Sequence, residues 1–214
     1  MYLPAHFQAK EDGDILKVIS SGGAVDLVSN FSGKLNVSTL PMLHRPFPSA
    51  NGNSMGTLVG HLAKANPQLR DGTGSDALVI FRGPTGYISP AWYPTKLEHG
   101  KVVPTWDYIA VHVYGKLILH DERDWKLGLV TELTNHHESS FDKPWSVSDA
   151  PADFIEGQLK AIVGVEVEVD RVEAKFKLSQ NRSRAEIDGV ILNLRLLGHS
   201  ELADAVEEAC SSKD

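Results

Sequence analysis

Residues 164–178 have the sequence GVEVEVDRVEAKFKL, which contains the clearest strand pattern of the chain. Apolar Val165, Val167 and Val169 alternate with acidic side chains between them. A period of two is typical of a β-strand that has one face in the core and one face in water. The stretch therefore predicts a half-buried strand.

Shorter strand patterns precede this stretch, several of them in hairpins. Their ranges are 24–31 and 34–43, joined by Ser32-Gly33; 57–62; 77–82 and 86–89, separated by Gly83-Pro84; and 105–114 and 116–120, joined across Gly115. Sequential hairpins without regular βαβ alternation favour an antiparallel core over a Rossmann or TIM architecture. We expect a mainly β fold with α additions (α+β), built on an antiparallel barrel of about six strands.

Helical patterns lie at both ends and late in the chain. A near-helical segment, residues 6–21, ends at Gly22-Gly23, and one or two helical turns are expected over residues 63–69. Further helices are predicted over 121–135, 153–163, 183–197 and 200–210. We expect a single domain over residues 1–214, in which residues 183–214 form a C-terminal helical extension.

Composition excludes several protein classes. The chain has 214 residues, of which 42% are hydrophobic and 23% charged, as in a globular protein. The longest uncharged apolar runs, such as residues 77–81, are far shorter than the roughly 20 residues that cross a bilayer. The first residues have no signal-peptide pattern, so a cytoplasmic location is expected. A single cysteine, Cys210, excludes an internal disulfide and a cysteine-based zinc site.

Charge is segregated along the chain. A net charge of −7 argues against a nucleic-acid binder dominated by phosphate contacts. A basic stretch, residues 171–184, nevertheless carries Arg171, Lys175, Lys177, Arg182 and Arg184. The last fifteen residues are acidic. An anion is therefore expected at the basic stretch.

Four apparent motifs do not predict chemistry. Residues 52–56 match G-x-S-x-G, but a proline-rich segment precedes them where a nucleophile elbow needs a strand. We interpret residues 136–138 (His-His-Glu) as a solvated helix end and not a metal site, and glycine-rich residues 72–76 as a turn. The terminal helix 201–210 has no basic residue, so it is interpreted as a dimer or packing element and not a recognition helix.

Residues 81–96 and 103–108 combine aromatic rings, hydroxyls and a lysine. Aromatic faces beside hydroxyls and a cation suit a planar anionic ligand, because rings stack and hydroxyls and lysine bind phosphate. A barrel core with exposed turn residues accounts for the same composition equally well.

Five blocks of the sequence resemble the PaiB-like family of FMN-binding negative transcriptional regulators. They are residues 1–7 (MYLPAHF), 60–68 (GHLAKANPQ), 86–93 (GYISPAWY), 103–108 (VPTWDY) and 175–182 (KFKLSQNR). The resemblance implies an FMN-binding split barrel, related to pyridoxamine-phosphate oxidases and flavin reductases. It also implies a homodimer that holds FMN in a groove between subunits.

The resemblance also nominates residues. His61 and Lys64 match a pattern that lies at the FMN phosphate in related families, although a core histidine is the alternative for His61. The strand after Val103 resembles one that lines the flavin ring. The ring candidates are Thr105, Trp106 and Tyr108, and the remaining cofactor candidates are Ser89, Trp92, Lys96, Lys175, Gln180 and Asn181.

Three functions follow from the resemblance and the fold it implies. The first is a negative transcriptional regulator that contacts DNA through residues 171–184 or acts through a partner protein. The second is an FMN-dependent oxidoreductase with a nicotinamide donor, for which His61, Tyr108 and His112 are acid–base candidates. The third is a haem-binding split barrel, for which the candidates are His112, His120, His136 and His137.

Overall fold

A computed structural model describes residues 1–9, 11–21, 23–31, 33–46 and 55–211. The chain divides into two compact units. The first unit consists of residues 1–15, 82–111 and 173–214, and the second of residues 16–81 and 112–172. The expectation of a single domain stays a prediction.

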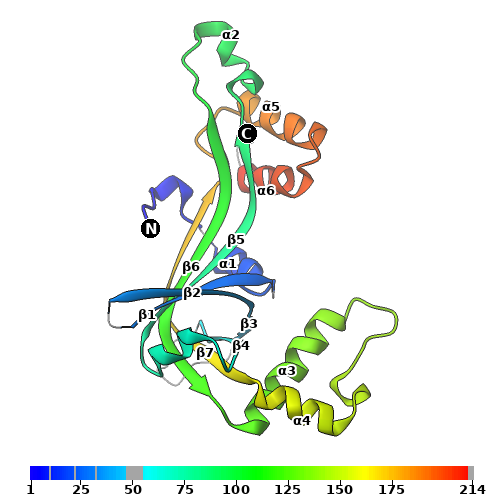
Figure 1. Ribbon diagram of the computed structural model, residues 1–214. Coiled ribbons are helices and arrows are strands. Elements are labelled where there is room, and N and C mark those ends of the chain that lie inside the picture. The colour runs from blue at the N-terminus through cyan, green and yellow to red at the C-terminus, as the bar shows by residue number, and fades with distance from the viewer. Residues whose placement is uncertain (10, 22, 32, 47–54, 212–214) are drawn as a thin grey trace. The chain divides into compact units, whose positions relative to one another are not determined.

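The strands form one sheet in the order β2-β1-β5-β6-β7-β4-β3 (Figure 1). Their bounds are β1 (Ala24–Phe31), β2 (Lys34–Pro41), β3 (Leu43–Arg45), β4 (Thr57–Ala63), β5 (Asp76–Ile88), β6 (Thr105–His120) and β7 (Ile162–Lys177). β1 pairs antiparallel with β2 and β5, and β4 pairs antiparallel with β3 and β7. The expected α+β class with an antiparallel sheet is confirmed. The sheet has seven strands because residues 34–43, predicted as one strand, divide between β2 and β3.

The second unit contains the hairpin expected near the start of the chain. Phe31 of β1 pairs with Lys34 of β2, and Ser32 of the predicted turn lies outside the described ranges. Alternation along the strands buries Leu27, Val79 and Val165 in the core of this unit. The alternation of β7 buries Val165, Val167 and Val169, as the pattern predicts, while Glu166 and Glu168 between them are half-buried.

Two glycines at which the sequence predicted strand breaks lie inside continuous strands. β6 runs through Gly115, and a Cβ there would lie 1.8 Å from the carbonyl oxygen of Glu168. β5 runs through Gly83, where a Cβ would lie 2.9 Å from the Cβ of Ile109. The predicted hairpin across Gly115 and the break at Gly83-Pro84 are therefore wrong. Both glycines permit close approach of a neighbouring residue and do not make turns.

The helices agree with prediction best at the C-terminal end. Their bounds are η1 (Ala5–Phe7), α1 (Asp12–Ile19), η2 (Pro67–Asp71), η3 (Pro90–Trp92), α2 (Thr95–His99), α3 (Arg123–Glu138), η4 (Val147–Asp149), α4 (Ala152–Lys160), α5 (Arg184–Leu196) and α6 (Ser200–Cys210). The near-helical segment 6–21 divides into η1 and α1, because Gln8 forms a bridge with Lys175 of β7. Within the described ranges, no helix combines the length and apolarity that crossing a membrane requires.

The first unit packs α5 and α6 against β5 (Figure 1). A Cβ on Gly86 would lie 2.7 Å from Leu202 and 3.9 Å from Leu194, so both helices contact this strand directly. α5 begins with a capping box, in which the Ser183 side chain accepts from the amide of Glu186 and the Glu186 side chain accepts from the amide of Ser183.

In the second unit, α3 packs on the sheet through Trp125. A Cβ on Gly164 of β7 would lie 2.1 Å from the Trp125 ring, so the ring rests on the bare backbone of the strand. His120 stacks on Trp125 with ring centroids 4.0 Å apart, and the Arg45 guanidinium lies 5.4 Å from the ring centroid. Leu129 and Leu133 of α3 are also buried, in a cluster with Val59 of β4 against which Trp125 packs, so both the ring and these leucines hold α3 on the sheet.

Replacement of Gly164 by alanine tests this packing. The added methyl group overlaps Trp125, and overpacking of this kind costs about 1–3 kcal/mol of folding free energy. At Gly128, within α3, a Cβ would have no atom within 4 Å, so Gly128→Ala is the matched control and stabilises the helix by about 1 kcal/mol. Urea unfolding of both variants measures the difference, and equal effects would contradict the packing of Trp125 on Gly164.

Candidate functional site

The residues nominated from sequence lie in both units. His61 and Lys64 belong to the second unit. The other nine belong to the first: Ser89, Trp92, Lys96, Thr105, Trp106, Tyr108, Lys175, Gln180 and Asn181. Each set is described within its own unit.

A buried polar network joins the start of β6 to the end of β7 in the first unit. The Lys177 ammonium donates to Thr105 Oγ1 at 2.7 Å and also to the carbonyl oxygen of Trp106. Its distance to Asp107 Oδ1 is 3.5 Å. The other carboxylate oxygen, Asp107 Oδ2, accepts from Ser179 Oγ at 2.6 Å. One carboxylate therefore links the strand β6 to both Lys177 and the turn that follows β7.

Asp107 is completely buried. Burial raises the pKa of its carboxyl above the ordinary value, although the hydrogen bond from Ser179 and the charge of Lys177 oppose the rise. A buried carboxylate requires such partners, because an unpaired charge in a protein interior is strongly destabilising.

The turn after β7 is held in an uncommon backbone conformation. Ser179 has φ of 62°, in the left-handed region that residues other than glycine seldom adopt. Gln180 stabilises the turn with both ends of its amide: Oε1 accepts from the amide of Leu178 at 2.8 Å, and Nε2 donates to the carbonyl of Phe176. The amide of Gln180 is thus engaged with its own turn, while Asn181 is exposed.

Lys175 stands apart among the lysines that the structure describes. It is half-buried, and it forms no ion pair with a carboxylate in the part of the chain that the structure describes. Its ammonium lies 5.5 Å from the ring centroid of Tyr108 and 5.6 Å from that of Tyr2, within cation–π range. Near the start of the same β6 strand, Trp106 is 55% exposed and meets Tyr87 edge to face. An unpaired cation and exposed rings therefore lie on adjacent strands.

The remaining candidates of the first unit have local roles or lie at the surface. Ser89 caps η3 by accepting from the amide of Ala91 at 3.2 Å. Trp92 is half-buried, and its carbonyl oxygen would lie 2.2 Å from a Cβ on Gly189 of α5. Lys96 is exposed on α2.

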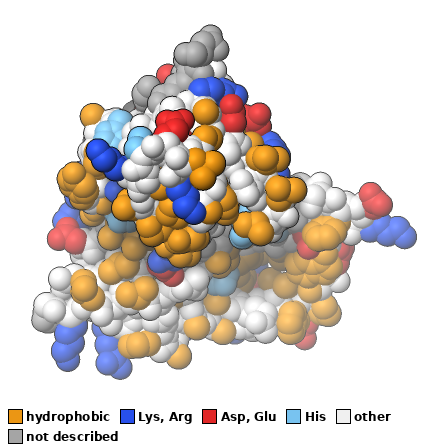
Figure 2. Space-filling view, turned by 90° about the horizontal axis from the view of Figure 1, so that it is seen from above, with side chains coloured by type: hydrophobic (Ala, Val, Ile, Leu, Met, Phe, Trp, Pro, Cys, Tyr) orange, Lys and Arg blue, Asp and Glu red, His pale blue; other side chains and the backbone are white. Residues whose placement is uncertain are grey.

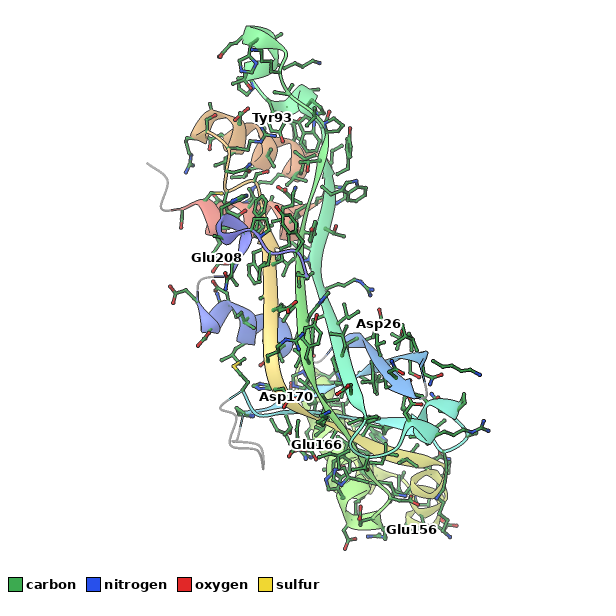
Figure 3. The ribbon with its side chains drawn as sticks, turned by 90° about the vertical axis from the view of Figure 1, so that its left-hand side faces the viewer. Asp26, Tyr93, Glu156, Glu166, Asp170 and Glu208 are labelled. Atoms are coloured by element: carbon green, nitrogen blue, oxygen red, sulfur yellow. The ribbon has the colours of Figure 1, made fainter. Side chains whose placement is uncertain are left out.

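Most of the basic stretch is engaged within the protein. Arg182 lies over the buried Tyr93, 4.8 Å from the ring centroid, and Tyr93 lies beside α5 (Figure 3). Arg184 pairs with Asp188 at 2.9 Å, and Arg171 stacks on Tyr114 at 3.5 Å. The predicted anion-binding stretch therefore presents Lys175 as its unpaired cation among the residues described.

In the second unit, His61 and Lys64 lie near the end of β4. Burial lowers the pKa of His61, so the imidazole is neutral at pH 7, and within the described ranges its ring nitrogens have no hydrogen-bond partner. Lys64 is exposed and donates to Asp121 at 2.9 Å. Asp121 also accepts from the buried Lys126 at 2.8 Å, and these hydrogen bonds lower the pKa of Asp121 to about 2.

The histidines considered for haem differ in availability. His120 Nε2 contacts Glu166 Oε2 at 2.8 Å while the ring stacks on Trp125, so its nitrogen is engaged. His112 meets Tyr114 edge to face, and His136 and His137 are exposed on α3. Among the described residues, no group of three or more His, Cys, Asp or Glu side chains could hold a metal ion.

Sequence reasoning missed Asp107, Ser179 and Lys126, and it named Lys177 as part of the basic stretch but not as a cofactor candidate. One signal was available, because Lys175 and Lys177 alternate along one strand and so share a face. The buried carboxylate of Asp107 had no such signal, because an aspartate between Trp106 and Tyr108 has no periodicity that marks its side chain as internal.

The residues of the first unit fit the ring of the FMN that the resemblance implies. In the second unit, His61 has ring nitrogens without a hydrogen-bond partner among the described residues, whereas the Lys64 ammonium is engaged with Asp121. A flavin ring needs aromatic contact and a donor or cation near its polar edge, which Trp106, Tyr108 and Lys175 supply in the first unit.

Comparison with known proteins gives a consistent result. Residues 1–171 match the family described as "Putative FMN-binding domain". The chain is 32% identical to "Protease synthase and sporulation protein PAI 2" of Bacillus subtilis, over 91% of this chain and 89% of that protein. It is 35% identical to an uncharacterized protein of Emericella nidulans, over 81% of each chain.

Solved structures share the fold at low sequence identity. A conserved hypothetical protein from Mycobacterium tuberculosis has a TM-score of 0.55 at 10% identity, over 86% of this chain and 95% of that one. A FAD and haem binding protein from Mycobacterium smegmatis has a TM-score of 0.53 at 14% identity, over 79% of this chain and 73% of that one. These structures confirm the split-barrel fold that the resemblance implies. The family match and the Bacillus subtilis relative confirm the resemblance itself.

Replacement of Asp107 by asparagine tests the buried carboxylate through pH. Because the pKa of Asp107 is raised in the folded protein, its stabilising contribution is complete below pH 3.8 and is lost as pH rises through the folded pKa. As pH falls, the free energy of unfolding of the wild type should therefore increase relative to that of Asp107→Asn. Urea unfolding between about pH 3 and pH 7 measures this difference.

Asp76→Asn is the control, because its effect on stability should depend on pH in the opposite direction. Lys116 lowers the pKa of Asp76, so its contribution is present above pH 3.8 and is lost as pH falls through the folded pKa. The same pH trend in both variants would contradict the buried state of Asp107.

Proposed function

The chain belongs to the PaiB-like family of FMN-binding domains, and from this premise we propose that it is a homodimeric flavin-binding regulator whose output is negative control of transcription. The observation that carries the proposal is Lys175, a half-buried ammonium without a carboxylate partner among the residues described, beside the ring of Tyr108. A cation left without a counter-ion in an acidic protein favours an anionic ligand at that place.

The residues have separate roles in this proposal. When bound, FMN supplies reversible one- and two-electron redox chemistry. Trp106 and Tyr108 provide aromatic contact for the ring, and Lys175 faces its polar edge. Lys177, fixed by Asp107, positions the hydroxyl of Thr105 and the backbone carbonyl of Trp106. Lys64 and His61, in the second unit, are proposed separately as candidates for a phosphate group.

Contact with DNA through the basic stretch is not favoured. Arg171, Arg182 and Arg184 are engaged with Tyr114, Tyr93 and Asp188, so they are not arranged as a free row of phosphate ligands. On α6 the acidic residues Asp204 and Glu207 pair with Arg195 of α5, at 2.7 Å each. These contacts support regulation through a partner protein.

Two lysine variants separate the phosphate contact from the ring contact. Lys64→Ala should weaken FMN binding about tenfold to a hundredfold, because a hydrogen bond between charged groups contributes about 1.5–3 kcal/mol. Its affinity for riboflavin, which has no phosphate, should not change. Lys175→Ala should weaken binding of FMN and riboflavin alike. Quenching of flavin fluorescence measures all four affinities.

Lys34→Ala, at an exposed lysine of β2, is the control and should bind both flavins as the wild type does. Wild-type affinity for FMN in both site variants would overturn the assignment of the two lysines. Loss of riboflavin binding by Lys64→Ala would place this lysine at the ring instead.

The proposed function is tested by three measurements on the flavin-loaded protein: sedimentation, reduction by NADPH and binding of DNA. We expect it to sediment as a dimer and to leave its FMN oxidised when NADPH is added without oxygen. We also expect no salt-dependent shift of DNA by the protein on its own. Bleaching of the flavin by NADPH would establish the competing function, an FMN-dependent oxidoreductase, and a sedimentation coefficient of a monomer would contradict the homodimer.

A further inference from the structure

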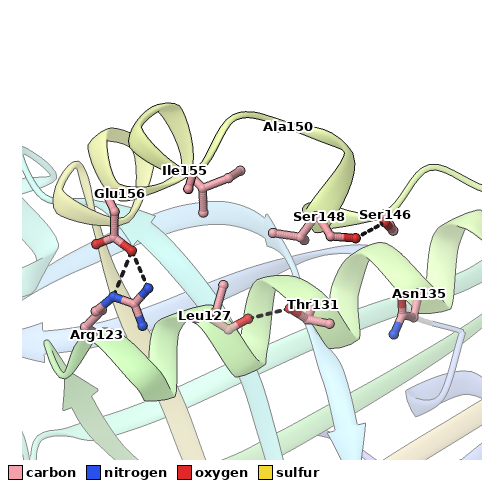
Figure 4. Close-up of a pocket in the computed structure, with 11 residues that line it drawn as sticks. Arg123, Leu127, Thr131, Asn135, Ser146, Ser148, Ala150, Ile155 and Glu156 are labelled. Atoms are coloured by element: carbon pink, nitrogen blue, oxygen red, sulfur yellow. Dashed lines mark hydrogen bonds and ion pairs between the residues drawn. The ribbon is translucent and has the colours of Figure 1, made fainter.

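The helical module of the second unit, residues 121–161, encloses a groove. α3, η4 and α4 surround a cavity of about 450 Å³ (Figure 4). Its apolar lining includes Leu127, Val147 and Ile155, and its polar lining includes Thr131, Ser146 and Ser148. None of these residues belongs to the set assigned above to the flavin.

The groove is fixed by bonds within the module. At one end, Arg123 Nε donates to Glu156 Oε1 at 2.8 Å, linking the first turn of α3 to α4. Opposite α3, the capping box of Ser146 and Asp149 holds η4 in place. The amide of Trp145 donates to Glu138 Oε2 at 2.8 Å, which ties the loop to the end of α3. A groove held open in this way avoids the ordering cost that a flexible loop would add to binding.

Large aromatic side chains are exposed on the same module. Phe141 is 61% exposed, Trp145 is 45% exposed and Phe154 is 56% exposed. Aromatic residues are the side chains that most often dominate binding energy at protein interfaces. Hydrophobic side chains are exposed elsewhere too, as the view in Figure 2 shows, so exposure does not by itself select this surface.

The charge of the module is a second reason to select this surface. Residues 121–161 contain nine acidic and four basic residues, a net charge of −5 out of −7 for the whole chain. Part of this charge is paired: Arg123 with Glu156 and Asp124, Lys126 with Asp121 and, from outside the module, Arg45 with Glu132 and Lys64 with Asp121. The module still carries more acidic than basic residues, and an acidic surface with apolar anchors is complementary to a segment that carries both cationic and apolar side chains.

We propose that the module formed by α3, η4 and α4 is a docking surface for a basic amphipathic segment of a partner protein. The apolar side chains of this segment occupy the groove and contact the exposed aromatic residues, and its lysines and arginines face the acidic residues around them. The inference does not depend on FMN, because the module and the flavin candidates share no residue.

Two synthetic peptides test the proposal on the full-length protein. The first has leucine and lysine at amphipathic helical spacing, and the second has glutamate in place of every lysine. Fluorescence anisotropy of the labelled peptides measures affinity. We expect the lysine peptide to bind, to bind more weakly as salt rises, and to bind far more tightly than the glutamate peptide.

Variants decide whether binding occurs at the groove. Phe154→Ala should weaken binding of the lysine peptide about tenfold or more, as loss of an aromatic anchor does. Thr131→Arg, which fills the groove and adds positive charge, should do the same. Leu196→Ala removes an exposed apolar side chain of α5, 74% exposed, and should leave affinity unchanged.

Urea unfolding of each variant shows that it is folded. Equal affinity for the two peptides, or equal affinity of the wild type, Phe154→Ala and Thr131→Arg for the lysine peptide, would overturn the proposal. Self-association that Phe154→Ala abolishes, without peptide binding, would assign the groove to a second copy of the chain and would also overturn it.

Discussion

The buried carboxylate of Asp107 is the constraint on which the first unit depends. It cannot remain charged in the core without partners, so Lys177 and Ser179 must lie where they do. Lys177 in turn fixes the start of β6, where the exposed ring of Trp106 lies. Ser179 is held in a left-handed conformation, and this directs the chain from β7 into α5. One internal charge is therefore linked both to the start of β6, at Thr105 and Trp106, and to the turn that enters the C-terminal helices.

Much of the fold was predictable, because the spacing of hydrophobic residues along a strand or helix is a local signal. β1 and α6 have the bounds that the sequence patterns indicate, and the alternation of β7 places its valines inside. The errors share one cause. From the neighbouring sequence alone, Gly83 and Gly115 indicate strand breaks. In the fold they allow close approach of Ile109 and of the carbonyl of Glu168, respectively. That requirement arises between distant strands, so a local pattern does not contain it.

The candidate site was predictable in its residue types and less so in its roles. Resemblance identified Lys175, and the structure distinguishes it from Lys177 by the charges that each one faces. Gln180 was nominated for the cofactor, yet its amide is engaged with its own turn. Asp107 could not be found from sequence, because a buried charge is recognised by its partners and these come from another strand and a turn. Pairwise contacts between distant segments decide the role of each polar residue.

The uneven distribution of charge has a consequence for how molecules of this protein meet in solution. Residues 121–161 carry a net charge of −5, so the remainder of the chain has a net charge of only −2. Electrostatic repulsion between two approaching copies is then strongest where their helical modules face one another. Encounters in other orientations are less strongly opposed, and added salt reduces the difference. The helical module therefore biases the orientation of collisions, and it does so before any contact is made.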